Sequence, residues 1–473
     1  MGARNRIIFL LARLIPNLLG LVTTAVLTRL LEPTEYGLYA LGLSITFFLT
    51  IGVFEWLGLS VLRMAAATEQ PDLFFGTVLT CFCGLCGLSV AGAALTLILA
   101  GLQNYAVLAA VCLVATFAGA WFELKQRLQM AELREMDYFW TSAGRGLTTI
   151  IIVCATAYFF DGNVSLIILA LATSFFAASF IAREPRLNFR KLQFDFSAFF
   201  PLLRFGLPLS ISVGLATILA SVDKWLLQGF WGTQGVGLFS AAAVVAQTPI
   251  MALAAGIGPS AYSMAVQALE FRSPEAVRTQ LAQSFTILLA IVAPSAAGIV
   301  ALSNNLAHLM VGPAYWQSAI LLSPWLAAAA VLSTLRVFYV DIAFQLAHQT
   351  SRLIWTTSVT VAANVALDIW LIPSLGELGA AIGSFSAMFI GLVITTIASI
   401  SVFRLPIPLA DTAKVGVSTA IMFLVLNEFA GSSGVLTLVC QIAAGSLVYA
   451  SGLIAFNVLG VRSRLLQRLI RRL

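Results

Sequence analysis

Charged residues are scarce in this sequence: Asp, Glu, Lys and Arg together make up only 10% of its 473 residues. A soluble globular protein carries about 25% charged residues, so the composition excludes an ordinary soluble domain. Hydrophobic residues reach 60%, and the mean hydropathy is +0.98. We therefore predict an integral membrane protein. Its net charge of +6 is interpreted as a set of topology signals rather than as a nucleic-acid-binding surface.

Histidine and cysteine are also few, with two and six residues. His308 and His348 lie in loops or at the ends of apolar segments and belong to no metal-binding pattern. All six cysteines fall inside apolar segments, so the spacing of Cys83 and Cys86 is interpreted as small-residue packing rather than as a redox motif. The sequence predicts no disulfide framework, no metal site and no cofactor.

Long apolar segments fill most of the chain, and a membrane-spanning helix needs about 20 such residues. Fourteen segments qualify, and the first is interpreted as an uncleaved span. Their approximate ranges are 7–31, 37–63, 73–100, 104–124, 138–160, 163–183, 202–228, 235–260, 279–302, 316–342, 351–372, 378–403, 411–429 and 435–459. The predicted fold is an all-α polytopic membrane protein of about 14 transmembrane helices.

A repeated pattern organises these segments. A proline bends the first and the seventh segment, and YGLY at 36–39 opens the second as VGLF at 236–239 opens the eighth. Copies that are six spans apart enter the membrane in the same direction, which predicts two parallel six-helix lobes around a central cavity. The predicted hinge residues are Pro16, Pro208, Gly37 and Gly237.

The repeat predicts five parts: an N-terminal six-helix lobe (1–183), a basic cytoplasmic linker (184–201), a C-terminal six-helix lobe (202–403), two additional transmembrane helices (404–461) and a basic amphipathic tail (462–473). Lys and Arg collect in cytoplasmic loops. With the N-terminus inside, 21 of the 26 basic residues fall in inner segments, which predicts that both termini are cytoplasmic. The segment 121–137 mixes charged and apolar residues and is expected to extend the fourth span along the membrane surface.

Four stretches carry a family resemblance: 30–45, 205–227, 235–253 and 364–387, the last with an Asn-rich span end, a proline and Gly-x-x-Gly-Ala-Ala. They resemble the polysaccharide-exporting flippases of the multidrug/oligosaccharidyl-lipid/polysaccharide exporter superfamily. The resemblance implies translocation of undecaprenyl-diphosphate-linked oligosaccharide repeat units from the inner to the outer leaflet of a bacterial inner (plasma) membrane. The mechanism would be alternating access without enzymatic chemistry.

The same resemblance implies partners and an energy source. The partners are the lipid-linked anionic oligosaccharide, membrane lipids and, in the same pathway, a polymerase and a chain-length regulator, with the protein itself a monomer. Transport would use H⁺, Na⁺ or the membrane potential. The alternatives are a cation-coupled multidrug exporter of the same superfamily, a polysaccharide polymerase, ligase or glycosyltransferase, and a passive scaffold. The enzymes need a sizeable outer loop, and no outer loop here exceeds about a dozen residues.

Charged residues inside the spans are the candidate site residues, because a charge at the centre of a bilayer costs about 2.5–3.5 kcal/mol on insertion scales. The basic candidates for binding an anionic substrate are Arg13, Arg145, Lys224 and Arg336, with Arg29 at the outer end of the first span. For the arginines inside the spans the alternative is snorkelling to the inner headgroups, and for Arg29 it is a surface role.

Two acidic residues complete this set. Glu55 is predicted either to pair with Arg13 or to carry a coupling proton, and Asp223 forms either a structural ion pair with Lys224 or part of a substrate contact. Asp368, near the outer end of a span, is expected to be solvated.

Overall fold

The computed structural model describes residues 3–463 except 67, 102, 183–186, 188, 190–191, 272–273, 348, 350, 430–433 and 461. The side chains of 3–11, 13–14, 257–263, 266–271 and 274 are also outside the described part. The side chain of Arg13, the whole of His348 and all of the predicted tail except Arg462 and Ser463 therefore lie outside the described residues.

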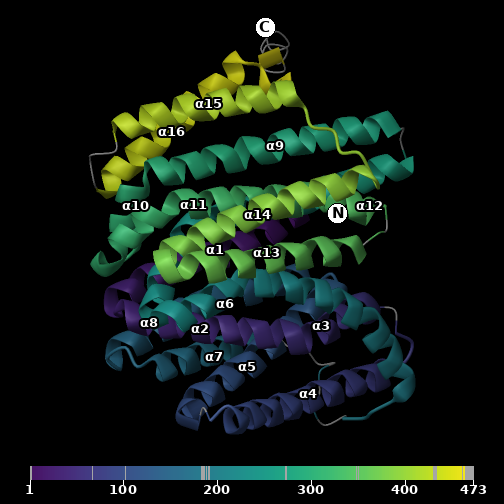
Figure 1. Cartoon of the computed structure of the whole chain (residues 1–473). Helices are drawn as coiled ribbons and strands as arrows, with labels where there is room; N and C mark the ends of the chain where they lie inside the picture. The colour runs from purple at the N-terminus through teal and green to yellow at the C-terminus, as the bar shows by residue number, and fades with distance from the viewer. Residues whose placement is uncertain are drawn as a thin grey trace. The chain divides into compact units, whose positions relative to one another are not determined.

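The chain divides into two compact units, residues 1–237 (unit 1) and 238–473 (unit 2). Figure 1 draws unit 1 from purple to teal and unit 2 from teal to yellow. This division is based on which residues pack together, whereas the predicted lobes are based on a repeat in the sequence. The predicted lobes and linker therefore stay predictions.

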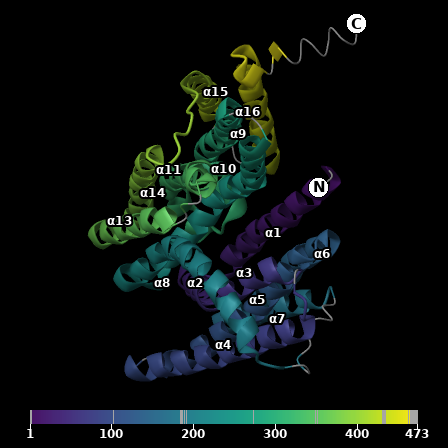
Figure 2. The same cartoon turned by 90° about the vertical axis from the view of Figure 1, so that its right-hand side faces the viewer.

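Unit 1 contains α1 (Ala3–Leu30), α2 (Pro33–Leu49), α3 (Glu55–Met64), α4 (Pro71–Leu99), α5 (Ala106–Ala131), α6 (Glu135–Phe159), α7 (Val164–Ser179) and the first part of α8 (Phe196–Phe271). A π-helical turn, Thr50–Phe54, joins α2 to α3, and a 3-10 turn, Gln103–Tyr105, precedes α5. Helix α1 packs on α6, and α5 packs on both α3 and α7. Helix α4 lies at the edge of the unit (Figure 2); its first half contributes buried residues between Phe74 and Phe82, and from Cys83 to Leu99 no residue is buried.

Unit 2 contains the rest of α8, then α9 (Pro274–Ala301), α10 (Ser303–Met310), α11 (Trp316–Leu335), α12 (Ile342–Leu346), α13 (Ser351–Leu375), α14 (Glu377–Ile400), α15 (Leu409–Glu428) and α16 (Val435–Ala455). A π-helical turn, Arg336–Val340, joins α11 to α12, and 3-10 turns lie at Pro313–Tyr315 and Val458–Gly460. Helix α14 packs on α11 and α13, and α15 packs on α9 and α16 (Figure 1).

The last helix, α16, is hydrogen-bonded to other helices of unit 2. The Tyr449 hydroxyl donates to the Ala290 carbonyl at 2.8 Å, and the buried Asn305 amide donates to Gln441 Oε1 at 3.0 Å. These bonds link α16 to α9 and α10. Because buried polar groups are costly unless they are bonded, the pairs fix the angle at which α16 docks.

The predicted fold class is confirmed. The described residues are 90% helix without strands. They include 11 helices long and apolar enough to cross a membrane, and Ile15–Leu30 and Val164–Ser179 are shorter apolar helices. One of the 11, Phe196–Gly256, has 61 residues, enough for two crossings. The predicted number of about 14 spans is thus consistent with the structure.

Local sequence signals explain where the helices change direction. Pro33 occupies the first turn of α2, where its missing N–H costs nothing, and the Glu35 carboxylate accepts from the Glu32 backbone N–H at 3.0 Å. Helix α8 breaks at Gly232, whose φ of 71° suits a residue without a Cβ. The predicted turn between the seventh and eighth spans therefore centres on Gly232.

Candidate functional site

A cavity of about 210 Å³ lies among α2, α5, α7 and the first part of α8, wholly within unit 1. It is lined by Thr46, Phe47, Thr50, Ile51, Glu55, Gly119, Glu123, Arg127, Phe175 and Val213. A larger cavity of about 600 Å³ lies where α3 ends and α8 begins, and its charged lining residues, Arg63 and Asp195, stand at helix ends. We place the candidate site in the smaller cavity because its charged groups lie inside the helical bundle.

An ion pair forms the polar wall of this cavity. Arg127 Nη2 lies 2.5 Å from Glu55 Oε1, and the two side chains are 25% and 8% exposed. Glu55 directly follows the π-helical turn, and Glu123 lies one helical turn before Arg127 on α5. The cavity thus holds two carboxylates and one guanidinium. The predicted partner Arg13 has its side chain outside the described residues, so that pairing stays a prediction.

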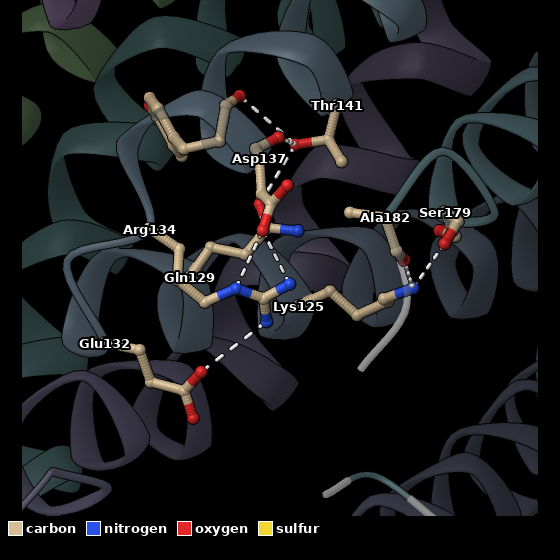
Figure 3. Close-up of polar contacts among 9 residues, drawn as sticks. Lys125, Gln129, Glu132, Arg134, Asp137, Thr141, Ser179 and Ala182 are labelled. Atoms are coloured by element: carbon tan, nitrogen blue, oxygen red, sulfur yellow. Dashed lines mark hydrogen bonds and ion pairs between the residues drawn. The ribbon is translucent and has the colours of Figure 1, made fainter. Parts of the chain in front are cut away.

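Polar contacts near the C-terminal end of α5 hold these residues in place (Figure 3). The buried ammonium of Lys125 donates to the backbone carbonyls of Ser179 and Ala182, the latter at 2.9 Å. A cation at the C-terminal end of a helix, here α7, complements both the unsatisfied carbonyls and the helix dipole. Lys125 therefore fixes α5 against α7, and with it the neighbouring Glu123 and Arg127.

The same end of α5 is also bonded to α6. Thr141 Oγ1 on α6 donates to Gln129 Oε1 on α5 at 3.0 Å, and Arg134, the N-cap residue of α6, donates through Nε to Asp137 Oδ2 in the first turn of α6 at 2.7 Å (Figure 3). The segment 121–137 was expected to extend the fourth span along the membrane surface, and this expectation is wrong for the first half of the segment. Lys125 and Gln129 are buried because the contacts with α6 and α7 satisfy their polar groups.

Arg145, on α6, lies against two aromatic rings. Its Cζ atom is 5.5 Å from the centroid of Phe122 and 5.7 Å from that of Phe175. A guanidinium is attracted to the face of an aromatic ring. Phe175 also lines the cavity, so Arg145 packs against a ring that forms part of its wall. Its predicted role in anion binding remains a prediction.

Arg336 is placed in unit 2, where it is 4% exposed. It donates to Thr360 Oγ1 at 3.0 Å and to Thr357 Oγ1 at 2.7 Å, both on α13. The guanidinium is thus bonded within the helices, whereas a snorkelling arginine would reach the surface. Its contact with an anionic substrate stays a prediction.

The remaining predicted charges stand on α1 and α8. Arg29 is exposed and donates to the Ala25 carbonyl at 2.5 Å, in the last turn of α1. Asp223 is 6% exposed and Lys224 is half-buried. Their proposed pairing or substrate contact stays a prediction.

The two predicted hinge glycines lie against each other's helices, and all the residues concerned belong to unit 1. A Cβ atom at Gly37 would lie 1.8 Å from the Thr233 carbonyl oxygen, and one at Gly237 would lie 1.9 Å from the Pro33 carbonyl oxygen. Gly37 thus faces the carbonyl of Thr233, four residues before Gly237, and Gly237 faces the carbonyl of Pro33, four residues before Gly37. Of the two prolines, Pro16 lies inside α1 against Gly146 of α6, and Pro208 is exposed on α8.

One buried acid was missed. Asp368, expected to be solvated, is fully buried and accepts from the Asn364 amide at 3.2 Å. A Cβ at Gly383 would lie 2.2 Å from Asp368 Oδ1, so α14 approaches this carboxylate closely. The four-residue spacing of Asn364 and Asp368, which places both on one helix face, was the available signal.

The fold defines a polytopic, all-helical membrane protein that carries charged residues inside its helices. The chain is similar in structure to the lipid II flippase MurJ in an inward closed conformation, with a TM-score of 0.77, 16% identity and coverage of 95% of this chain and 99% of that one. It is also similar to an inward-facing multidrug resistance MATE family transporter of the MOP superfamily (TM-score 0.62, 16% identity, 83% and 98% covered). A third is a MOP superfamily transporter from Pyrococcus furiosus (TM-score 0.56, 16% identity, 84% and 95% covered). These likenesses show the shared fold.

Sequence comparison identifies the family. The model of the polysaccharide biosynthesis protein family matches residues 26–320, more than half of the chain. The chain belongs to this family, which confirms the resemblance drawn from its sequence. A comparison with curated protein sequences found no match.

Proposed function

We propose that the protein flips undecaprenyl-diphosphate-linked oligosaccharide repeat units from the inner to the outer leaflet of a bacterial inner membrane, for surface or exopolysaccharide synthesis. The observation that carries this proposal is the membership of a polysaccharide biosynthesis family in a chain whose fold matches a lipid II flippase over 95% of its length. Lipid II and the proposed substrate are both glycans attached to a lipid.

The charges inside the helices agree with such a substrate. A diphosphate crossing hydrocarbon needs fixed cations, and an arginine suits phosphate because its planar fork donates two parallel hydrogen bonds. Arg145 is half-buried inside unit 1, and the aromatic rings beside it hold its guanidinium in a defined place. In this proposal Arg145 contacts the diphosphate, while the apolar helix surfaces accept the lipid tail.

The proposal includes a location and a way of working. Both termini are cytoplasmic, the monomer works by alternating access without enzymatic chemistry, and transport is coupled to H⁺, Na⁺ or the membrane potential. A polymerase and a chain-length regulator act on the product.

The test uses a deletion strain and purified protein. Loss of the gene should trap lipid-linked repeat units in the inner leaflet and reduce surface glycan. The purified full chain in proteoliposomes should move those units to the opposite leaflet, where an added glycan-modifying enzyme reaches them. Unchanged surface glycan with raised drug sensitivity would support the multidrug exporter instead, and inactive proteoliposomes would argue against a flippase.

A further inference from the structure

The walls of the unit 1 cavity combine carboxylates, a guanidinium, hydroxyls and aromatic rings. Phe47, Phe175, Ile51 and Val213 form apolar walls, and the polar groups lie between them. Phe47 is 46% exposed and Arg127 is 25% exposed, so the cavity reaches the surface of unit 1. A molecule bound here would meet apolar faces and hydrogen-bonding groups at the same time.

Two polar groups in the cavity wall are uncommitted. The Thr46 hydroxyl belongs to a side chain that is 3% exposed and makes no hydrogen bond within the described residues, although the Cys112 thiol, a weak hydrogen-bonding group, is near it. Glu123 is half-buried, and within the same described part its carboxylate makes no hydrogen bond or ion pair. A buried polar group without a partner costs about 1–3 kcal/mol, so the Thr46 hydroxyl indicates a ligand that supplies the missing bond, and the Glu123 carboxylate is available to accept from the same ligand.

The charges select the class of ligand. Two carboxylates outnumber one guanidinium, and Glu55 already holds Arg127, so a phosphate would be repelled. A metal cation would be opposed by Arg127, and the described residues contain no cluster of three or more His, Cys, Asp or Glu side chains placed to hold one. The volume of about 210 Å³ equals that of about seven water molecules at ~30 Å³ each, too much for a single ion.

A neutral polyol fits these walls. Its hydroxyls donate to carboxylates in charge-assisted hydrogen bonds and accept from threonine, while its C–H face packs on aromatic rings. The volume suits one sugar ring rather than a whole repeat unit. We infer that this cavity binds one uncharged sugar ring of the transported glycan, with Glu123 and Thr46 as the specificity-determining residues. The inference rests on the proposed function.

Its position suits a glycan arriving from the inner leaflet. Glu55 lies nine residues before the end of α3 and Glu123 eight before the end of α5. At 1.5 Å per residue, both carboxylates lie about 12–14 Å along their helices from the C-terminal ends of α3 and α5. The distribution of basic residues predicts that these two helix ends are on the cytoplasmic side.

Three variants test the site without breaking the Glu55–Arg127 pair. Glu123→Gln removes the negative charge of the carboxylate and keeps one acceptor oxygen, and Thr46→Val removes the hydroxyl. Gly119→Leu fills the cavity, because a Cβ at Gly119 sits at ordinary contact distance, 3.8 Å, from both Phe175 and Thr50. Gly87→Leu on α4 is the matched control, since no atom lies within 4 Å of its Cβ position.

The measurement is binding of two probes to the purified full chain in lipid nanodiscs: the host's undecaprenyl-diphosphate-linked repeat unit and undecaprenyl diphosphate without sugar. Glu123→Gln should weaken binding of the first probe about tenfold, because a charge-assisted hydrogen bond becomes a neutral one. Thr46→Val should weaken it about fivefold, the effect of losing one neutral hydrogen bond of about 1 kcal/mol, and Gly119→Leu should weaken it about tenfold or more because its side chain occupies the cavity. All three should leave binding of the second probe unchanged. Thr46→Ser should restore binding relative to Thr46→Val, and Gly87→Leu should match the wild type for both probes.

The outcomes separate this site from the proposed function, which repeat-unit transport by the wild type tests independently. If the wild type transports repeat units and all three variants bind both probes as it does, the sugar site is refuted and the flippase stands. Equal weakening of both probes would also overturn the site, since it would show no preference for the glycan.

Discussion

Substituting either Gly37 or Gly237 by alanine should force two helix segments apart. An added Cβ would meet a backbone carbonyl oxygen at 1.8 Å or 1.9 Å, whereas a C–H···O contact needs about 3.3 Å. The backbones must therefore separate by about 1.5 Å. A flexible side chain could turn aside, but a carbonyl within a helix cannot move without its helix.

The expected cost follows from two opposing effects. Overpacking costs about 1–3 kcal/mol, and the backbone obstacle places these variants at the upper end. Replacing glycine by alanine inside a helix recovers up to about 1 kcal/mol, so we expect a net loss of about 2 kcal/mol for Gly37→Ala or Gly237→Ala. Gly214→Ala and Gly229→Ala are matched controls on α8: no atom lies within 4 Å of their Cβ positions, so they should be neutral or stabilising.

The assay is thermal unfolding of the purified chain in detergent, together with repeat-unit transport in proteoliposomes. Both hinge variants should unfold at lower temperature than the wild type and the controls. The double variant Gly37→Ala/Gly237→Ala should cost less than the sum of the singles, because the first separation makes room for the second methyl group. Single variants as stable as the controls, or full additivity, would refute the close crossing.

Three further substitutions test the buried charges. Arg127→Ala should destabilise the protein by about 3 kcal/mol because the buried Glu55 carboxylate loses its partner. The double variant Glu55→Gln/Arg127→Met should recover much of this stability, because no buried charge is left unpaired. A double variant no more stable than Arg127→Ala would contradict this reasoning. Lys125→Met should lower the unfolding temperature because two carbonyls at the C-terminal end of α7, those of Ser179 and Ala182, lose their donor. Arg63→Met, at an exposed site, should not lower it, and equal effects of the two variants would contradict the capping role. Arg336→Lys should fail in transport as Arg336→Met does, because a lysine cannot hold two threonines in the fork geometry; retained transport with lysine would instead favour a role of charge alone.

Hydropathy predicted the spans well because the thickness of a bilayer dictates the length of each apolar segment. The repeated glycine motifs also marked two special positions, since only a residue without a side chain permits the crossing of Gly37 and Gly237. Their mutual contact was not predictable, because a repeat shows that two segments are alike and does not show that they touch.

The partners of the charged residues were harder to predict. The predicted fourth span ends at 124, which places Lys125 and Arg127 among the 21 basic residues of the inner segments, yet α5 continues past them to Ala131 and buries Lys125. A charge near the end of a span is therefore ambiguous: it either meets headgroups or caps a neighbouring helix. Only the rotation of the helix about its axis decides between these, and hydropathy does not contain that rotation.

The π-helical turns are a second reason why the partners of the charged residues were hard to predict from the sequence. Thr50–Phe54 ends directly before Glu55, and Arg336–Val340 begins at Arg336. One extra residue in a helical turn rotates everything beyond it by about 100° relative to a regular α-helix. A regular continuation of α2 would therefore carry Glu55 to another face, away from Arg127. In unit 2 the wide turn lets the Asp341 N–H bond to the Arg336 carbonyl at 2.9 Å while the Arg336 side chain reaches α13. In both units a buried charge thus stands where the helical register shifts, so its direction depends on a feature that apolar periodicity alone does not reveal.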